Sequence, residues 1–294
     1  MSIKKRQKRS ALLAYIILAV GAVFMIIPFL WMVLTSFKTY RETVKLPIQW
    51  FPAEWNFDNY VEVLKQLDFL RYYRNTILVT VTTLVAMTLI ASLAAYAFAR
   101  MEFPGKNVIF ALLLVVYMVP PQMTMIPKYM MITKLGWVDT LAGIVVPNIF
   151  SVYTMFMLRQ FFVSVPKELD EAAKLDGCSF FGIFWRVDLP LIRNGLIAIT
   201  VLNLLWSWND LLWPLIATST DKMRVLSVAI ATLNNSDGSQ YQLLMAAGVL
   251  AVLPMLVIYA ICQEYFMDGI MSSGVKGCCL LYTSDAADDS LRVD

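Results

Sequence analysis

Long apolar runs, separated by short polar segments, dominate this chain of 294 residues. A helix needs about 20 apolar residues to cross a hydrocarbon core ~30 Å thick, because each residue adds ~1.5 Å. Six runs reach that length, and the alternation typical of membrane β-strands is not seen. The pattern therefore predicts an all-α fold, a polytopic membrane bundle of six transmembrane helices, at about 11–37, 76–99, 107–127, 139–158, 195–217 and 243–265.

The composition agrees with a bilayer protein and narrows its chemistry. Apolar residues make up 59% and charged residues 15%, whereas soluble domains are nearer half apolar and a quarter charged. The net charge of +3 is too small to indicate nucleic-acid binding. The chain has no His, and its four Cys form no CxxC pair. The sequence therefore predicts no metal site and no catalytic residue.

The basic cluster Lys4–Arg9 directly precedes the first apolar run. By the positive-inside rule this cluster predicts a cytoplasmic N-terminus, and six crossings return the C-terminus to the same side. The first run is too long for the apolar region of a signal peptide, so an uncleaved span is expected. The loop 38–75 then lies outside, and the segment 159–194 is a cytoplasmic loop.

The last residues, 278–294, differ in character from the rest of the chain. The stretch CLLYTSDAADD, which starts at Cys279, resembles the translation of a transposon-end sequencing adapter. Segments of that origin are excluded from fold reasoning. We therefore expect residues 1–277 to form one transmembrane domain and 278–294 to be a non-native tail.

A short polar helix is predicted inside the loop 159–194, between two spans. Pro166 and several acids suit its first turn, and Gly177 stands where a left-handed C-cap is expected. Ser179 can cap a second short helix, which Leu189–Pro190 would end. These residues predict a helix–turn–helix with a charged tip. An ordinary interfacial loop is the competing interpretation.

A longer pattern runs through this helix pair: Glu171-Ala172-Ala173, three residues, Gly177, nine residues, Val187, one residue, Leu189-Pro190. It resembles the EAA motif of bacterial ABC-importer permeases, EAA-x3-G-x9-I-x-LP, with Val187 in place of Ile. Nearly the whole chain up to 277 resembles the MalG-type permease subunits of carbohydrate importers, called binding-protein-dependent transport system inner-membrane components. The other matching segments are SFKT (36–39), NYVEVL (59–64), RNTILVT (74–80), MVPPQMTMIPKY (118–129), WNDLLWPL (208–215) and SSGVKG (272–277).

The resemblance implies the type I ABC-importer permease fold and import of a sugar or oligosaccharide by alternating access. In such importers the EAA loop is a coupling helix that docks in a cleft of a separate ATPase. The implied partners are a second permease subunit of MalF type, two cytoplasmic ATPase subunits and an extracytoplasmic solute-binding protein, at the bacterial cytoplasmic (inner) membrane. The implied coupling residues are Glu171, Ala172, Ala173, Asp176, Gly177, Leu189 and Pro190.

The chain has no G-x-x-x-x-G-K-[ST] loop to hold phosphates. We therefore expect no cofactor on this chain, with ATP and Mg used by the partner ATPase, and we expect a translocation subunit rather than an enzyme. A stand-alone ion-coupled secondary transporter is the alternative. That class favours paired intramembrane carboxylates and inverted repeats, whereas this chain has one clear mid-span carboxylate, Asp210, and no visible repeat. The lack of His argues against a membrane enzyme.

Polar and aromatic side chains interrupt the apolar pattern of the fifth span. An intramembrane carboxylate is costly in lipid and by default faces a pore or a partner helix. Sugars bind aromatic faces and amide or carboxylate groups, although the same side chains could instead bond neighbouring spans. Which sugar is carried stays open, and so does a glycerophosphodiester or a polyol. The candidate substrate path comprises Trp208, Asn209, Asp210 and Asn203, with Tyr117 and Asn148 on neighbouring spans.

Overall fold

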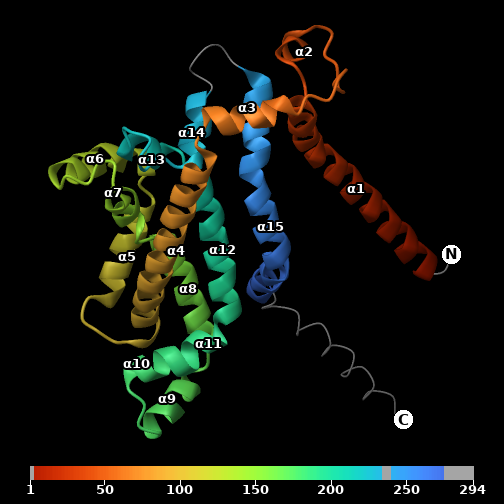
Figure 1. The fold of residues 1–294 in the computed structure, drawn as a ribbon. Coiled ribbons are helices and arrows are strands. Elements are labelled where there is room, and N and C mark those ends of the chain that lie inside the picture. The colour runs from red at the N-terminus through yellow and green to blue at the C-terminus, as the bar shows by residue number, and fades with distance from the viewer. Residues whose placement is uncertain (1–2, 234–239, 275–294) are drawn as a thin grey trace, which may run out of the picture. The chain divides into compact units, whose positions relative to one another are not determined.

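The computed structural model describes residues 3–233 and 240–274, and over these residues it consists of helices without strands. The predicted tail, 278–294, lies outside the described residues. In chain order the elements are α1 (Ile3–Ser36), α2 (Tyr40–Val44), α3 (Asp58–Gln66), α4 (Phe69–Arg100), α5 (Lys106–Tyr117), η1 (Pro121–Thr124), α6 (Met125–Lys134), α7 (Leu141–Val145), η2 (Val146–Asn148), α8 (Val152–Ser164), α9 (Lys167–Leu175), α10 (Phe180–Ile183), η3 (Phe184–Asp188), α11 (Leu189–Leu191), α12 (Arg193–Asn209), α13 (Leu212–Ala217), α14 (Leu226–Leu233) and α15 (Tyr241–Gly274) (Figure 1).

Three of the described helices are long and apolar enough to cross a membrane on their own. They are Leu12–Ser36, Phe69–Arg100 and Tyr241–Gln263. Three bent helix pairs meet the same criterion together. They are Lys106–Tyr117 with Pro121–Lys134, bent by 96°, Leu141–Asn148 with Val152–Ser164, bent by 47°, and Phe180–Leu191 with Arg193–Asn209, bent by 80°. The predicted all-α membrane fold is therefore confirmed, with up to six spans if each bent pair is one span.

The predicted third span, 107–127, is not one helix. Helix α5 ends at Tyr117, and the segment from Pro121 to Lys134 that follows is bent from it by 96°. Pro120 and Pro121 stand at this break, and neither can donate the backbone hydrogen bond that would continue α5. The chain therefore turns away from the axis of α5 after Tyr117, although the sequence stays apolar beyond that residue.

The predicted fifth span, 195–217, is also interrupted. Helix α12 ends at Asn209, and α13 begins three residues later. In an unbroken helix the N–H of residue 214 would donate to the carbonyl of Asp210, but Pro214 has no N–H. The Asp210 carbonyl instead accepts a hydrogen bond of 2.6 Å from the Ser227 hydroxyl.

The chain forms two compact units. Unit 1 contains Met1–Leu78, Gly136–Leu141 and Asn209–Leu256. Within it, the Asn75 amide donates to the carbonyls of Lys222 and Arg224, at 3.1 and 3.0 Å. The side chain of Lys38 is buried over the Trp31 ring, 4.1 Å from its centroid, and burial lowers the pKa of this amine.

Unit 2 contains Val79–Leu135, Ala142–Trp208 and Val257–Asp294. Its core is an aromatic and aliphatic cluster in which Tyr96 meets Phe162 and Phe184 edge to face, with ring centroids 5.7 and 5.2 Å apart. Such pairs add to the stabilisation that burial provides. This core holds the last turns of α4 against α8, η3 and α12. The buried members are Ala91, Ala95, Tyr96, Phe98, Met155, Leu158, Phe162, Val165, Phe184, Ile192 and Ile199.

Candidate functional site

The short polar helix predicted from the sequence is α9, which lies with α10 and α11 at one end of unit 2 (Figure 1). Pro166 precedes its first residue, Glu168 and Asp170 occupy its first turn, and Lys174 its last. Each charge therefore complements the partial charge at its end of the helix. The local pattern explains why nine residues suffice for a helix here.

The end of α9 has the hydrogen bonds of a Schellman motif. The N–H of Gly177 donates to the Lys174 carbonyl at 3.0 Å, and the N–H of Cys178 donates to the Ala173 carbonyl at 2.9 Å. Gly177 has φ +82°, in the left-handed region that favours glycine. The predicted left-handed C-cap is confirmed, and it reverses the chain between α9 and α10.

The second helix of the pair is anchored in the core of unit 2. The Ser179 hydroxyl accepts the N–H of Gly182 at 3.2 Å, as predicted for its cap. Ile183 and Phe184 are buried, and the π-helix η3 continues through Leu189 and Pro190 to the end of α11 at Leu191. The predicted end at Leu189–Pro190 is therefore one residue early, and a bend of 80° separates this segment from α12. The helix pair is therefore joined to a membrane span by continuous short helices.

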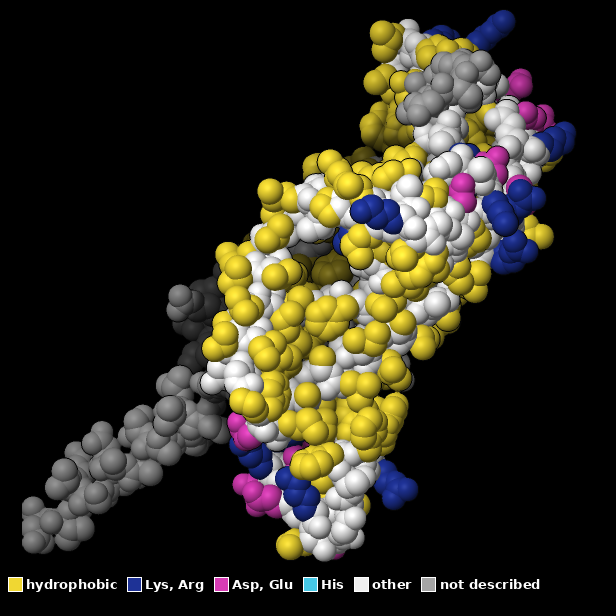
Figure 2. Space-filling view, turned by 90° about the vertical axis from the view of Figure 1, so that its left-hand side faces the viewer, with side chains coloured by type: hydrophobic (Ala, Val, Ile, Leu, Met, Phe, Trp, Pro, Cys, Tyr) yellow, Lys and Arg dark blue, Asp and Glu magenta, His cyan; other side chains and the backbone are white. Residues whose placement is uncertain are grey.

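The outer face of α9 is open. Glu171 and Ala172 are exposed, Leu169 is 42% exposed and Ala173 is half-buried. Two adjacent alanines give this face a low relief that allows close approach by another backbone. In Figure 2 charged side chains gather at the end of unit 2 that holds α9, and hydrophobic side chains cover most of the surface directly above it. This contrast suits a polar partner at the tip and lipid along the helices above it.

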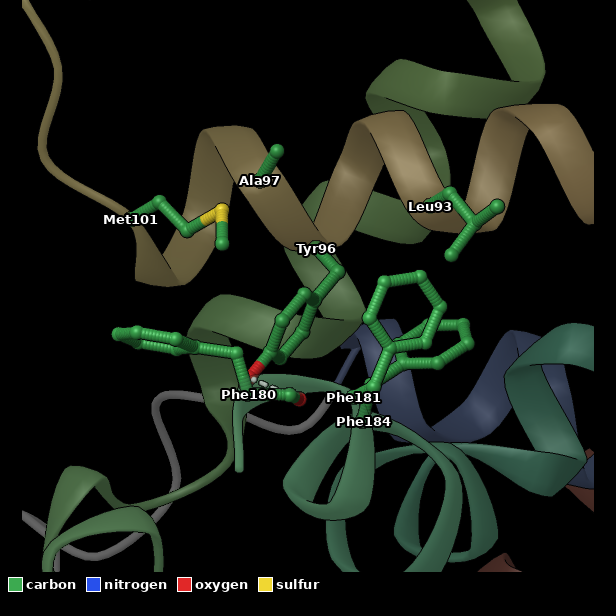
Figure 3. A pocket seen from close by; sticks show the side chains of 7 residues that line it. All are labelled: Leu93, Tyr96, Ala97, Met101, Phe180, Phe181 and Phe184. Atoms are coloured by element: carbon green, nitrogen blue, oxygen red, sulfur yellow. Dashed lines mark hydrogen bonds between the residues drawn. The ribbon is translucent and has the colours of Figure 1, made fainter. Parts of the chain in front are cut away.

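An apolar pocket of about 220 Å³ lies between the last turns of α4 and the α10–η3 segment (Figure 3). The Tyr96 hydroxyl donates to the Phe180 carbonyl at 3.3 Å, and this bond joins the two walls. Its aromatic lining also packs η3 onto α4. The lining residues are Leu93, Tyr96, Ala97, Met101, Phe180, Phe181 and Phe184.

A buried charge cluster, which the sequence did not reveal, lies between α9 and the end of α4. The Arg100 guanidinium approaches Asp170 at 3.1 Å and Asp188 at 3.3 Å, and it donates to the Val165 carbonyl at 2.9 Å. From sequence, Asp170 was only one of the acids at the start of the helix. In the sequence, Arg100 is visible only as a basic residue at the end of an apolar run. Its acidic partners are 70 or more residues away, so they could not be identified before the fold was known.

The candidate substrate-path residues of unit 2 fall into two groups. Trp208 and Asn203 are buried, and the Asn203 amide donates to the Thr154 hydroxyl at 3.0 Å. Tyr117 is 55% exposed, and Asn148 is half-buried with its amide donating to the Ile144 carbonyl at 3.3 Å. Trp208 and Asn203 are thus buried inside unit 2, whereas the Tyr117 side chain lies on its surface.

The other two candidates, Asn209 and Asp210, belong to unit 1. Asn209 is exposed and Asp210 is half-buried. They stand at the break between α12 and α13, where the backbone leaves the helix. Polar groups gathered at a helix break are typical of transporter binding sites.

An aromatic row in unit 2 includes one residue that sequence reasoning passed over, Tyr153. Its ring stacks on Tyr117, with centroids 6.2 Å apart, and meets Trp206 at 5.3 Å. Trp206 is 57% exposed. The three residues come from α5, α8 and α12, so only the folded chain places their rings in a row.

Comparisons with known proteins agree on one family. The family described as binding-protein-dependent transport system inner membrane component matches residues 87–271. AraQ of Halalkalibacterium halodurans, an arabinooligosaccharides transport system permease protein, is 31% identical over 92% of this chain and 100% of its own. NgcG of Streptomyces coelicolor, a diacetylchitobiose uptake system permease protein, is 32% identical over 91% of this chain and 89% of its own.

A solved structure has the same fold. It is a bacterial ABC transporter involved in the import of the acidic polysaccharide alginate, and its similar chain has a TM-score of 0.77 at 22% identity, covering 90% of this chain and 99% of that one. The bent apolar helices, the charged helix pair with its left-handed turn and the relatives along almost the whole chain lead to one conclusion. The protein is a multi-pass membrane permease that belongs to the family of binding-protein-dependent transport system inner membrane components.

Proposed function

We propose that this chain is the translocation subunit of an ATP-driven importer for a sugar or oligosaccharide, and that α9 docks on a separate ATPase. The observation that carries the proposal is the exposed face of α9, with Glu171 and Ala172 outward, on a helix joined through η3 and α11 to a membrane span. A partner that displaces α9 would thereby move the span. Permeases named for oligosaccharide uptake are among its relatives, which supports a carbohydrate as the substrate.

The proposed assembly follows from what this chain lacks and what its family name states. Its sequence has no phosphate-binding loop, so ATP and Mg belong to the partner ATPase. The family is defined by dependence on a binding protein. We infer a second permease subunit of MalF type, two ATPase subunits and an extracytoplasmic solute-binding protein, with Glu171, Ala172, Ala173, Asp176, Gly177, Leu189 and Pro190 forming the ATPase-coupling segment.

We place the N- and C-termini and α9 in the cytoplasm, and the loop 38–75 outside, on the strength of the Lys4–Arg9 cluster. Gln49 and Lys174 are both exposed and report the two sides. In a variant without the native cysteines, an impermeant thiol reagent added to intact cells should label Gln49→Cys and leave Lys174→Cys unlabelled. Labelling of Lys174→Cys alone would reverse the orientation and remove α9 from the ATPase side.

For the substrate path we propose that exposed aromatic rings, rather than the buried Trp208 and Asn203, contact the sugar first. The row Tyr117–Tyr153–Trp206 offers ring faces of the kind that stack on sugar C–H surfaces. Asn148 adds a hydrogen-bonding group in the same unit, and Asn209 and Asp210 remain separate candidates for hydroxyl recognition at the helix break of unit 1. This division assigns stacking to one set of side chains and hydroxyl recognition to another.

Transport assays test the function directly. Proteoliposomes with the assembled importer, enclosed ATP and external binding protein should accumulate a labelled oligosaccharide. Uptake should stop without ATP and persist when a protonophore collapses ion gradients. Uptake by this chain alone, driven by an ion gradient, would instead establish the secondary-transporter alternative.

Substitutions of the proposed substrate-path residues test, in the same assay, whether these side chains contact the sugar. Trp206→Ala and Asp210→Ala should each lower uptake about tenfold while the ATPase still co-purifies, since neither residue belongs to α9. Trp206→Phe keeps an aromatic face and should retain most of the uptake. Normal uptake by both Ala variants would show that this part of the chain is only scaffold.

A further inference from the structure

The charge cluster at Arg100 is the main buried attachment of α9 to the rest of unit 2. Asp170 is the only buried residue among the nine of α9, and the others are exposed or half-buried. The side chains of Arg100, Asp170 and Asp188 are 4%, 9% and 0% exposed. Helix α9 therefore has little apolar packing of its own. An ion pair holds its one buried side chain, and Lys174 at its exposed end lies over the Phe180 ring, 5.4 Å from the centroid.

Buried ion pairs are poor sources of stability, because desolvation of the charges offsets their attraction. In this cluster the hydrogen bonds that would offset desolvation are also incomplete. One guanidinium faces two carboxylates, and within the described residues Asp170 Oδ1 and Asp188 Oδ2 have no hydrogen-bond partner. The Arg100 Nε–Asp170 contact is an ion pair without the alignment of a hydrogen bond. The cluster is therefore better suited to fixing the position of α9 than to stabilising the fold, and specifying one geometry is the best-attested role of buried polar groups.

The geometry also shows which elements the cluster joins. Arg100 is the last residue of α4, Val165 precedes α9, Asp170 lies within α9, and Asp188 ends η3. By contrast, η3 has a second attachment, because Phe184 packs on Tyr96 in the apolar core. Loss of the cluster would therefore free α9 while leaving η3 in place.

We propose that Arg100 is a positioning residue that locks α9 to the end of α4 through Asp170, so that displacement of α9 by the partner ATPase moves this membrane span as one body with it. This inference rests on the proposed function. It adds a direct connection to α4, beside the connection through η3 and α11 to α12. Without Arg100, α9 would still dock but would move without the span.

Uptake and ATP hydrolysis by the assembled importer test this connection. Arg100→Gln and Asp170→Asn should leave the amount of co-purified ATPase unchanged and lower the sugar moved per ATP hydrolysed at least fivefold. Arg159→Gln is the matched control, because Arg159 bonds the Phe98 carbonyl at 3.2 Å and lies over the Phe110 ring, with neither contact on α9. Asp188→Asn should change the ratio less than twofold, because one guanidinium still faces the carboxylate of Asp170.

A distance measurement separates positioning from general destabilisation. Spin labels at Glu102→Cys and Lys174→Cys, both exposed, report the end of α4 and the end of α9. In a background without native cysteines, their distance should stay narrow with and without ATP, and Arg100→Gln should broaden it. Arg100→Lys, which keeps one charge for Asp170, should restore part of the narrow distribution.

These experiments distinguish failure of the positioning role from failure of the proposed function. If no ATPase co-purifies with the unaltered chain, the proposed function fails. If the ATPase binds, and Arg100→Gln and Asp170→Asn transport with a normal ratio and a narrow distance, the positioning role is wrong. Failure of both variants to assemble would equally overturn it and leave the cluster a purely structural role.

Discussion

Glu171→Lys is expected to release the proposed partner ATPase from this permease. Glu171 is exposed on the outer face of α9, so its charge is open to a cationic partner. Truncating one member of a desolvated charge pair costs about 2–5 kcal/mol. Reversal of the charge adds repulsion, so we expect at least a hundredfold loss of affinity, which corresponds to about 3 kcal/mol. Co-purification from mild detergent at fixed salt should show the ATPase absent from the variant.

Two further variants sharpen this test. Glu102→Lys makes the same charge change on a residue that is exposed in the turn after α4, and it should leave the ATPase bound. Glu171→Gln removes the charge without reversing it and should give an intermediate loss that shrinks at high salt. Normal transport by Glu171→Lys, with the ATPase retained, would show that α9 is not the coupling element.

Gly177→Val is expected to impair transport at a later step than docking. Gly177 has φ +82°, and a Cβ at this position would meet no atom within 4 Å. The cost is therefore conformational, roughly 1–2 kcal/mol for a residue with a Cβ in the left-handed region and more for a β-branched one. Relief of that strain would shift the angle between α9 and α10 while leaving the Glu171 face of α9 intact.

For Gly177→Val we expect ATPase co-purification to persist, with stimulated ATP hydrolysis and uptake reduced together by about tenfold, the equivalent of 1.4 kcal/mol. Gly177→Asn is the conservative control, because Asn tolerates the left-handed region better than other residues with a side chain. Gly182→Ala is the positional control, since its Cβ would lie at an ordinary 3.5 Å from the Ser179 hydroxyl. Full activity of Gly177→Val would show that the turn is not part of the moving element.

The interruptions of the spans illustrate a limit of hydropathy. The apolar run 107–127 and the run 195–217 are each long enough to cross a bilayer, yet α5 ends at Tyr117 and α12 at Asn209. The prolines near each break were visible in the sequence. What could not be foreseen was the partner of the freed Asp210 carbonyl, the hydroxyl of Ser227.

The amino-acid sequence by itself determined the all-α membrane class, the polar helix α9, its left-handed end at Gly177 and the Ser179 cap. These features depend on apolar length and on hydrogen bonds between residues three to five positions apart, so neighbours along the chain suffice to specify them. The family could be identified for the same reason, because the EAA pattern is a fixed local spacing.

Only the tertiary structure decided which distant residues meet. Arg100 pairs with Asp170 and Asp188, Asn203 is buried against Thr154, and Tyr117, Tyr153 and Trp206 form one row. Each of these contacts joins different helices, and it depends on how those helices rotate and pack. Apolar side chains can pack in many ways, so a hydrophobic pattern leaves such rotations undetermined. A buried charge restricts the choice, because packings that leave it without a partner cost too much free energy.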